Sequence, residues 1–251
     1  MTTKLSRTIL TAIASALTAV TALFTAGCAS SEVSHSVPGF REHDIVGIDI
    51  SAHNGDIDFD KVRDEGIEFV IIKATEGGTF KDRKFVDNVR EARKAGLKVG
   101  AYHFFRFDTP GYIQGLNFVN SIHGRQLDLP VAIDIEEFTN PNLQTSRLVM
   151  NRVVEMADHL ESRGYRVMLY TNKKGHARFI KGQLATYPLW LCSLGSRPDD
   201  IDCDLWQATH HGHVSGVEHD VDVNVFTSSR DAWELFSSGA LNDTIKTQIS
   251  R

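Results

Sequence analysis

The chain has 251 residues, with 27 Lys and Arg against 32 Asp and Glu, a net charge of −5 and 41% hydrophobic residues. This length is sufficient for a domain with a substantial core, and the composition excludes disordered, collagen-like and coiled-coil proteins. Phosphate contacts need clustered Lys and Arg, so an acidic chain without a basic run is not expected to bind nucleic acid.

The first 27 residues have the pattern of a secretory signal. Lys4 and Arg7 precede a run of Ala, Leu, Ile, Val and Thr, and the first acidic residue is Glu32. The following FTAGCAS resembles a bacterial lipobox, which predicts signal peptide 1–27 and lipidation of Cys28. Removal of the two basic residues takes the net charge from −5 to −7. The alternatives are cleavage by an ordinary signal peptidase, which leaves the cysteine bare, and a single membrane-spanning helix.

The rest of the chain divides into three parts. Residues 28–43 are polar with one Pro-Gly pair and are predicted to form a tether, 44–236 form the main domain, and 237–251 form a polar C-terminal tail. A lipid anchor at Cys28 predicts an exported, membrane-anchored lipoprotein of the cell envelope. Because Ala29 carries no Asp retention signal, we expect an outer-membrane or periplasm-facing location if the cell is Gram-negative.

From residue 44 the chain alternates between apolar runs and helical patterns. Helices are predicted by their apolar periodicity and terminal Gly residues at 59–66, 82–96, 109–124 and 145–164, with a weaker one through Phe179. Strands are predicted at 44–51, 68–75, 97–105, 129–138, 165–172, 187–194, 204–209 and 221–226.

This order predicts an α/β fold, an irregular TIM-like (β/α) barrel of five β/α units followed by three shorter strands. Connections between the last three strands are too short for long crossover helices, so some of them are expected to pair antiparallel. A doubly wound open sheet is the alternative.

Acidic residues gather at the ends of three predicted strands. Residues two apart in a strand share a face, so Asp134 and Glu136 point one way, and Ile133 and Ile135 point toward the helices. By the same alternation, Asp49 and Asp222 each lie on one face of their strand, and β-branched residues lie on its other face. Glu137 is interpreted as a residue that faces outward or into the loop.

Four acids that converge on one rim repel each other unless function or partners hold them there. Carboxylates facing one another in an aromatic cleft are typical of glycoside hydrolysis, in which one acid stays protonated. A divalent cation is the competing interpretation, either on these acids or on His210, His211 and His213, which lack standard ligand spacing. We expect no metal and no cofactor. The chain has no phosphate loop, dinucleotide fingerprint or serine nucleophile elbow.

Two cysteines remain in the main domain, Cys192 and Cys203. Export makes a disulfide between them feasible, and we predict that it forms. The alternative is a pair of buried free thiols.

Several segments occur in an order that resembles family 25 glycoside hydrolases, the Chalaropsis-type lysozymes. They are GIDISAHNGDIDFDKV, FVIIKATEGGTFKD, KVGAYHFFRF, PVAIDIEE, LYTN, DLWQAT and VDVNVF, running from about Val46 to Phe226. The resemblance implies a flattened β/α barrel and a retaining peptidoglycan N-acetylmuramidase. This chain departs from the family pattern at His53 and Asn54, where an aromatic residue is common, and at Cys192.

The resemblance also implies residue roles. Glu136 would be the general acid/base, and Asp134 would either support the substrate N-acetyl group as nucleophile or stabilise the oxocarbenium-like state. Asp49 and Asp222 would be the remaining rim acids, and Glu76 would order a loop. The saccharide groove would be lined by Tyr102, Tyr170, Trp206 and Gln207.

The predicted function is therefore that of a lysozyme, acting as a monomer on peptidoglycan glycan strands and attached to the membrane at Cys28. Two alternatives stay open at this point. One is a non-catalytic glycan-binding lipoprotein of the envelope, although binding alone would not need a rim of like charges. The other is a chitinase-like glycosidase with its own D-x-E strand.

Overall fold

The structure, a computed structural model, describes residues 44–140, 143–180, 182 and 184–241. The predicted signal peptide, the lipidation at Cys28, the whole predicted tether and the chain from residue 242 onward lie outside these residues. Among the residues described, no helix combines the length and the apolar character needed to cross a bilayer.

In the described part of the chain, nine strands form one sheet in the order β1-β9-β8-β7-β6-β5-β4-β2-β3. A further pairing of β1 with β2 closes the first eight of that order into a barrel and leaves β3 attached at its side. The strands are β1 (Ile45–Ile50), β2 (Phe69–Glu76), β3 (Phe80–Lys81), β4 (Lys98–Phe104), β5 (Val131–Asp134), β6 (Val167–Asn172), β7 (Leu189–Cys192), β8 (Leu205–Gly212) and β9 (Val221–Phe226). Closure confirms the barrel and removes the open sheet as an alternative.

The barrel is parallel except at one strand. Neighbouring pairs from β1 and β2 through β8 are parallel, whereas β9 is antiparallel to both β8 and β1. The short connection from β8 to β9 leaves no room for a crossover, so the chain returns directly as a hairpin. This confirms the expected irregularity of the last three strands.

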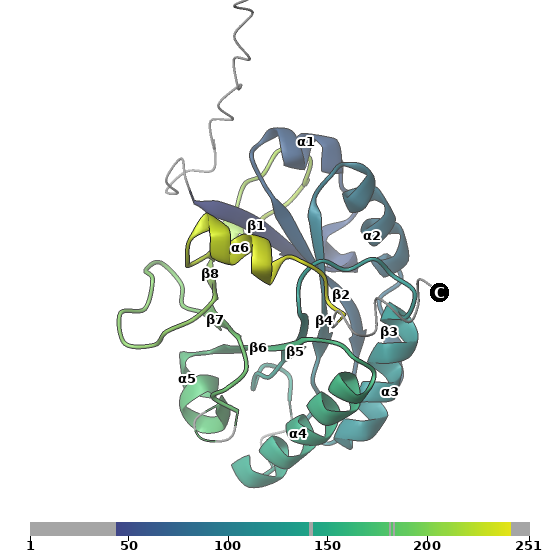
Figure 1. The fold of residues 1–251 in the computed structure, drawn as a ribbon, viewed down its shortest axis with the longest axis vertical. Coiled ribbons are helices and arrows are strands. Elements are labelled where there is room, and N and C mark those ends of the chain that lie inside the picture. Colours follow the sequence, from purple (N-terminus) through teal and green to yellow (C-terminus); the bar gives the residue numbers. More distant parts are fainter. Residues whose placement is uncertain (1–43, 141–142, 181, 183, 242–251) are drawn as a thin grey trace, which may run out of the picture. The chain divides into compact units, whose positions relative to one another are not determined.

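Helices cover the barrel unevenly. They are η1 (Ala52–Asn54), α1 (Phe59–Asp64), α2 (Phe85–Lys94), α3 (Gly111–Ile122), α4 (Ser146–Ser162), α5 (Lys173–Gly175), η2 (His176–Ile180) and α6 (Arg230–Phe236). Figure 1 shows α1 to α4 around one side of the barrel, while β7 and β8 lie on a side with shorter helical segments and loops.

The helix α4 shows why these segments are helical. Thr145 caps its start by accepting from Leu148 N, and Gly164 follows its end with a φ of 82°. One face of α4 buries Val149, Val153, Met156 and Leu160. Burial of that apolar face supplies most of the stability of an amphipathic helix of this length.

The core has two layers, one inside the barrel and one between the barrel and the helices. On β5, Ala132 lies in the inner cluster, whereas Ile133 belongs to the outer cluster with Ile135 just beyond the strand. The alternation of side chains along a strand produces this division. It confirms the facing predicted for the β5 residues and leaves the inner face free to carry Asp134.

The end of the barrel opposite to the carboxyl ends of the parallel strands is closed by α6, which was not predicted as a separate helix. Trp233 and Phe236 pack in the inner cluster, with the Trp233 ring centroid 5.0 Å from that of Phe69. Residues 239 and 240 then donate backbone hydrogen bonds to Asp128 and Leu127. The barrel domain therefore extends past the predicted boundary at residue 236.

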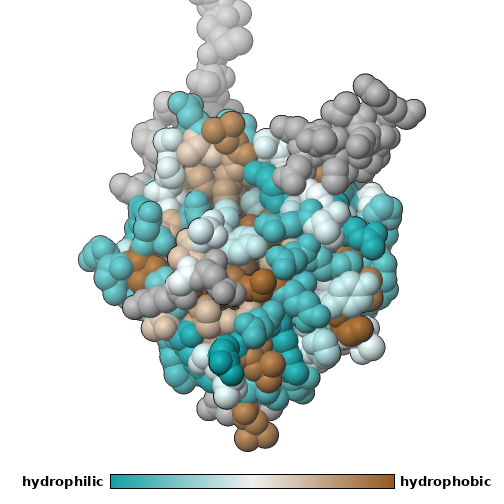
Figure 2. Space-filling model, turned by 60° about the horizontal axis from the view of Figure 1, so that its bottom comes forward, coloured by the Kyte–Doolittle hydropathy of each residue, from teal (hydrophilic) through white to brown (hydrophobic). Residues whose placement is uncertain are grey.

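Large hydrophobic side chains are also present on the surface. Phe80, Phe138, Leu143, Leu194 and Leu235 are each more than half exposed. Figure 2 shows hydrophobic side chains of one face in small patches among hydrophilic ones. Apolar burial is therefore concentrated in the two core layers.

The predicted disulfide between Cys192 and Cys203 is wrong: both thiols are free. Cys192 faces the barrel interior with Trp190, while Cys203 packs against Leu189 and Leu191 on the opposite face of β7. Side chains on opposite faces of one strand cannot be joined without moving the backbone. The alternative interpretation, two buried free thiols, is correct.

Candidate active site

The reversed direction of β9 brings two acids together. Asp222 is the second residue of β9, and Asp49 is the next-to-last residue of β1. Because the two strands are antiparallel, these positions are direct partners in the sheet. The start of β9 therefore lies at the same rim as the carboxyl ends of the parallel strands, where active sites of such barrels are found.

Side-chain amides hold this pair. Asp49 Oδ2 accepts from Gln207 Nε2 at 2.8 Å and from Asn224 Nδ2 at 2.9 Å. Gln207 Nε2 also donates to Asp222 Oδ2 at 3.3 Å. Asn224 and Gln207 are almost completely buried. The acids are thus fixed by donors that cannot rotate into solvent.

Two aromatic residues orient the amides in turn. Trp190 Nε1 donates to Asn224 Oδ1 at 2.8 Å, and the Tyr170 hydroxyl donates to Gln207 Oε1 at 2.7 Å. The rings of Tyr170 and Trp190 meet edge to face with centroids 4.5 Å apart. With their oxygens occupied, both amides must present their NH₂ groups to Asp49.

A second pair of acids lies at the end of β5. Asp134 is the last residue of β5, and Glu136 follows two residues later. Asn140 fastens the segment after the strand by donating to the carbonyls of Phe105 and Glu136, and Thr171 donates to the carbonyl of Ile135. The backbone that carries Glu136 is therefore fixed although it is no longer in the sheet.

Asp134 differs from Asp49 in its partners. It is 5% exposed, and within the described part of the chain its Oδ1 atom is buried without a hydrogen-bond partner. A buried acceptor with no donor costs free energy, so native proteins rarely retain one without a reason. The unpartnered oxygen distinguishes Asp134 from Asp49, whose Oδ2 atom accepts from two amides.

All four acids bind protons more tightly than free carboxyls do. Burial, followed by the charge of Asp222, raises the pKa of Asp49 to about 8. Burial raises the pKa of Glu136 to about 7 and that of Asp222 to about 6. Burial and the charge of Glu136 raise the pKa of Asp134 well above its usual range. The site therefore retains protons at neutral pH.

A cation in this site was missed by the sequence analysis. Lys73 lies on β2, its Nζ is 2.8 Å from Glu76 Oε2, and it stands 5.0 Å from the ring centroid of Phe104. Its charge opposes the rise in the pKa of both Asp134 and Glu136. Alternation from Phe69 and Ile71, both in the inner cluster, would have placed Lys73 inside the barrel.

Glu76 and Glu137, the two glutamates that were assigned non-catalytic roles from the sequence, lie beside the site. Glu76 pairs with Lys73 and lies 3.8 Å from Arg106, which agrees with its interpretation as an ordering residue. Glu137 forms ion pairs with Arg178 and Lys174. As predicted, Glu137 is directed toward the loop and helix side.

The aromatic predictions are only partly correct. Tyr102 and Tyr170 face the inner cluster beside Trp190. Trp206, predicted to line the groove, instead packs against a separate small cluster of Leu189, Leu191 and Cys203. Its Nε1 atom donates to the carbonyl of Ser193. Adjacent strand residues face opposite ways, so Trp206 and Gln207 cannot both point inward. The inner tryptophan is Trp190.

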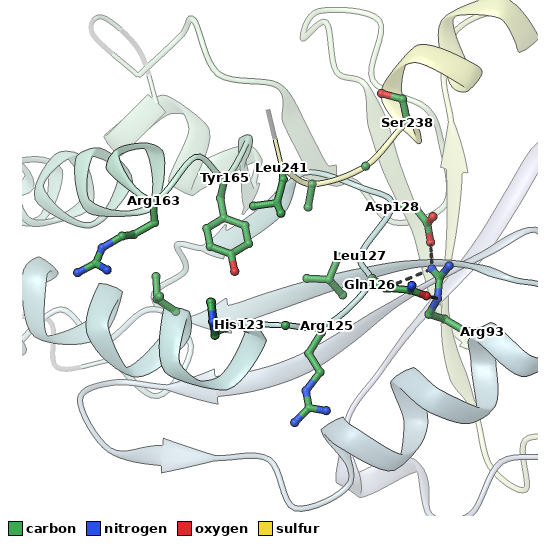
Figure 3. A pocket seen from close by; sticks show the side chains of 14 residues that line it. Arg93, His123, Arg125, Gln126, Leu127, Asp128, Arg163, Tyr165, Ser238 and Leu241 are labelled. Carbon is green, nitrogen blue, oxygen red and sulfur yellow. Dashed lines mark hydrogen bonds and ion pairs between the residues drawn. The ribbon is translucent and has the colours of Figure 1, made fainter. Parts of the chain in front are cut away.

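A cavity of about 830 Å³ lies elsewhere, at the end of the barrel where the parallel strands begin. Figure 3 shows Arg125, Arg163 and Tyr165 around it, and the bonded group of Arg93, Gln126 and Asp128 at one side. It contains none of the four acids. The cavity is therefore separate from the candidate site.

Two of the three histidines considered as metal ligands contact Asp220 and not the four acids. His211 and His213 both contact the carboxylate of Asp220, and their side chains are 82% and 85% exposed. Across the described ranges, no group of three or more His, Cys, Asp or Glu residues is arranged to hold a metal ion.

A closed β/α barrel with protonated and paired carboxylates beside aromatic rings at its carboxyl rim defines a carbohydrate-cleaving hydrolase. The family described as glycosyl hydrolases family 25 matches residues 48–217 of this chain. The chain belongs to this family.

Individual proteins of known sequence or structure are similar to this chain over most of the barrel. An autolytic lysozyme of Clostridium acetobutylicum is 33% identical over 183 residues, which are 72% of this chain and 55% of that protein. This chain thus spans about half the length of that relative. A family 25 glycosyl hydrolase from Bacillus anthracis superimposes with a TM-score of 0.73 at 31% identity, covering 79% of this chain and 95% of the other. A lysozyme from Streptomyces coelicolor gives 0.70 at 29% identity, covering 77% and 97%.

Proposed function

We propose that the protein is a lysozyme, an N-acetylmuramidase that hydrolyses the β-1,4 bond between N-acetylmuramic acid and N-acetylglucosamine in peptidoglycan. The observation that carries this proposal is the rim of four carboxylates, with Glu136 holding a proton near neutral pH beside an unpartnered Asp134 oxygen. Family membership and the lysozymes among its relatives support the choice of substrate.

Glu136 would act as the general acid and then as the general base. A pKa of about 7, raised by burial, leaves a large fraction of this carboxyl protonated at neutral pH. It would donate that proton to the glycosidic oxygen as the bond to the leaving sugar breaks. The carboxylate would then take a proton from the incoming water, which restores the starting state.

Asp134 would complete a retaining reaction through the substrate. Its unpartnered Oδ1 atom would accept a hydrogen bond from the N–H of the N-acetyl group, whose carbonyl oxygen would attack the anomeric carbon. A second displacement by water restores the original configuration. Electrostatic stabilisation of the oxocarbenium-like transition state is the alternative role for Asp134.

The place of action would be the cell envelope. The signal-like residues 1–27 and the lipobox-like segment at Cys28 support an exported lipoprotein held at a membrane. The glycan strands of the wall would be its partner, and we propose that it acts as a monomer.

Digestion of purified peptidoglycan by the wild type and by Glu136→Gln tests the proposal. Products are reduced with borohydride, and mass spectrometry identifies the sugar at each new reducing end. N-acetylmuramic acid at that end, formed by the wild type and not by the variant, is the expected result. N-acetylglucosamine at that end, or cleavage of chitin alone, would favour a different glycosidase. Glycan binding without any cleavage would favour the binding-protein alternative.

A further inference from the structure

His210, which lies outside the predicted site, contacts the Gln207 amide that holds the acid pair. Its Nε2 atom lies 3.1 Å from Gln207 Oε1 and 3.6 Å from Cys192 Sγ. In a regular strand, residues three apart face opposite sides. The register of β8 against β9 shifts on both sides of Thr209, and this irregularity returns His210 to the side of Gln207.

The chemistry of the neighbours fixes the direction of this hydrogen bond. Gln207 Nε2 faces Asp49 and Asp222, whose oxygens accept hydrogen bonds from it. Gln207 Oε1 must therefore face Tyr170 and His210. Because that carbonyl oxygen can only accept, the imidazole must carry a proton on Nε2.

We propose that His210 is a positioning residue that holds the Gln207 amide against the Asp49 and Asp222 pair. With two donors on its carbonyl oxygen, the amide cannot turn, and its N–H groups become stronger donors to the carboxylates. Cys192 packs its sulfur beside the same imidazole nitrogen and limits the movement of the ring. This inference rests on the proposed lysozyme function, since it concerns the same acids.

Two substitutions of His210 distinguish the loss of its hydrogen-bond donor from a change in side-chain volume. His210→Gln places an amide N–H near the position of Nε2, whereas His210→Met has a similar size and no donor. His211→Met is the matched control, because His211 is directed to Asp220 and is 82% exposed. On peptidoglycan, we expect His210→Met to lower kcat about tenfold with KM changed less than about twofold, as for one lost hydrogen bond. His210→Gln should recover at least about half of kcat, and the control should match the wild type.

A double-mutant cycle with Tyr170→Phe tests whether the two donors act through one oxygen. We expect the double variant to lose more than the product of the single losses, because the buried carbonyl then has no donor. Independent, multiplicative losses would overturn the proposal, as would wild-type kcat in His210→Met or equal loss in the Gln and Met variants.

A measurement that does not depend on catalysis distinguishes this inference from the proposed function. The side-chain NH₂ signals of Gln207 in ¹⁵N-labelled protein report whether the amide is held. They should exchange slowly in the wild type and in His210→Gln, and faster in His210→Met. If the wild type fails to cleave peptidoglycan, the proposed function fails. Equal exchange in all three proteins would overturn the positioning role of His210.

Discussion

The two halves of the acidic rim are built differently. On the side of β1, β8 and β9, Asp49 receives hydrogen bonds from two amides, and each amide is oriented by a buried ring. At the end of β5, Asp134 has an oxygen that lacks any donor among the residues described. One half is satisfied before substrate arrives, and the other half is not.

This difference indicates that one half of the rim positions charge and that the other half carries out the reaction. A satisfied network costs little to keep and holds its groups in one arrangement, which is useful for fixing charge around a sugar. An unsatisfied buried carboxyl is costly until a ligand donates to it. The open half is therefore the part of the rim where substrate is expected to react, and substitutions in the two halves should have different consequences.

The largest effect is expected in the open half. Glu136→Gln keeps the shape of the side chain but cannot donate a proton to the glycosidic oxygen. We expect kcat to fall by at least about 10³-fold, within the range for loss of a general acid. Turbidity loss of a peptidoglycan suspension measures it, with circular dichroism to verify folding. A fall of less than about tenfold would remove Glu136 from the role of acid.

A smaller effect is expected in the bonded half. Asp49→Asn keeps one oxygen to accept from Gln207 and Asn224, but it replaces the other carboxyl oxygen with an NH₂ group and removes the titrating carboxyl beside Asp222. We expect a loss of about 10- to 100-fold in kcat/KM, because the amide network must rearrange without removing the acid. Steady-state kinetics on soluble glycan fragments measure it. A loss as large as that of Glu136→Gln would place Asp49 in the chemical step.

The raised pKa of Glu136 predicts how stability depends on pH. Its pKa rises from 4.5 to about 7 on folding, so the folded state binds the proton more tightly than the unfolded state. The resulting stabilisation is complete below about pH 4.5 and is lost as pH rises through about 7. Relative to Glu136→Gln, the wild type should therefore lose on the order of 2 kcal/mol of unfolding free energy between pH 4 and 8.

Urea denaturation of both proteins across this pH range measures the difference between them, and titrating groups distant from Glu136 cancel in that comparison. A pH-independent difference would show that the Glu136 carboxyl is not perturbed by burial. A difference that grows with pH in favour of the wild type would contradict the sign.

The smallest effect is expected outside the rim. Trp206→Phe alters the small cluster around Leu191 and removes the hydrogen bond to the Ser193 carbonyl, so KM should change less than about twofold. Trp190→Phe removes the donor to Asn224 and should lower kcat/KM by about fivefold, as for one hydrogen bond of about 1 kcal/mol. Fluorescence titration with glycan fragments and kinetics compare the two. The reverse order would restore Trp206 to the groove.

Periodicity in the sequence predicted the strands of the barrel and the facing of the β5 acids, because alternation and apolar runs are local properties. It also predicted that the last strands would be irregular, from the length of their connections. Alternation placed Asp49 and Asp222 on one face of their strands, but their pairing as direct neighbours depends on the antiparallel direction of β9. That direction is set by the pairing of strands far apart in the chain.

The errors have the same physical origin. The disulfide between Cys192 and Cys203 was inferred from compartment and spacing, whereas the facing of β7 decides it. Trp206 was carried over by motif although its neighbour Gln207 already occupied the inward position. His210 could not have been found by alternation, because an irregularity in β8 changes its side.

The direction of β1 determines the end of the barrel at which the chain enters the domain. Ile45 begins the barrel at the end that α6 closes, and Asp49 lies toward the opposite rim. The described chain therefore enters the barrel at the end that α6 closes, and a molecule bound at the acidic rim contacts the opposite end of the domain.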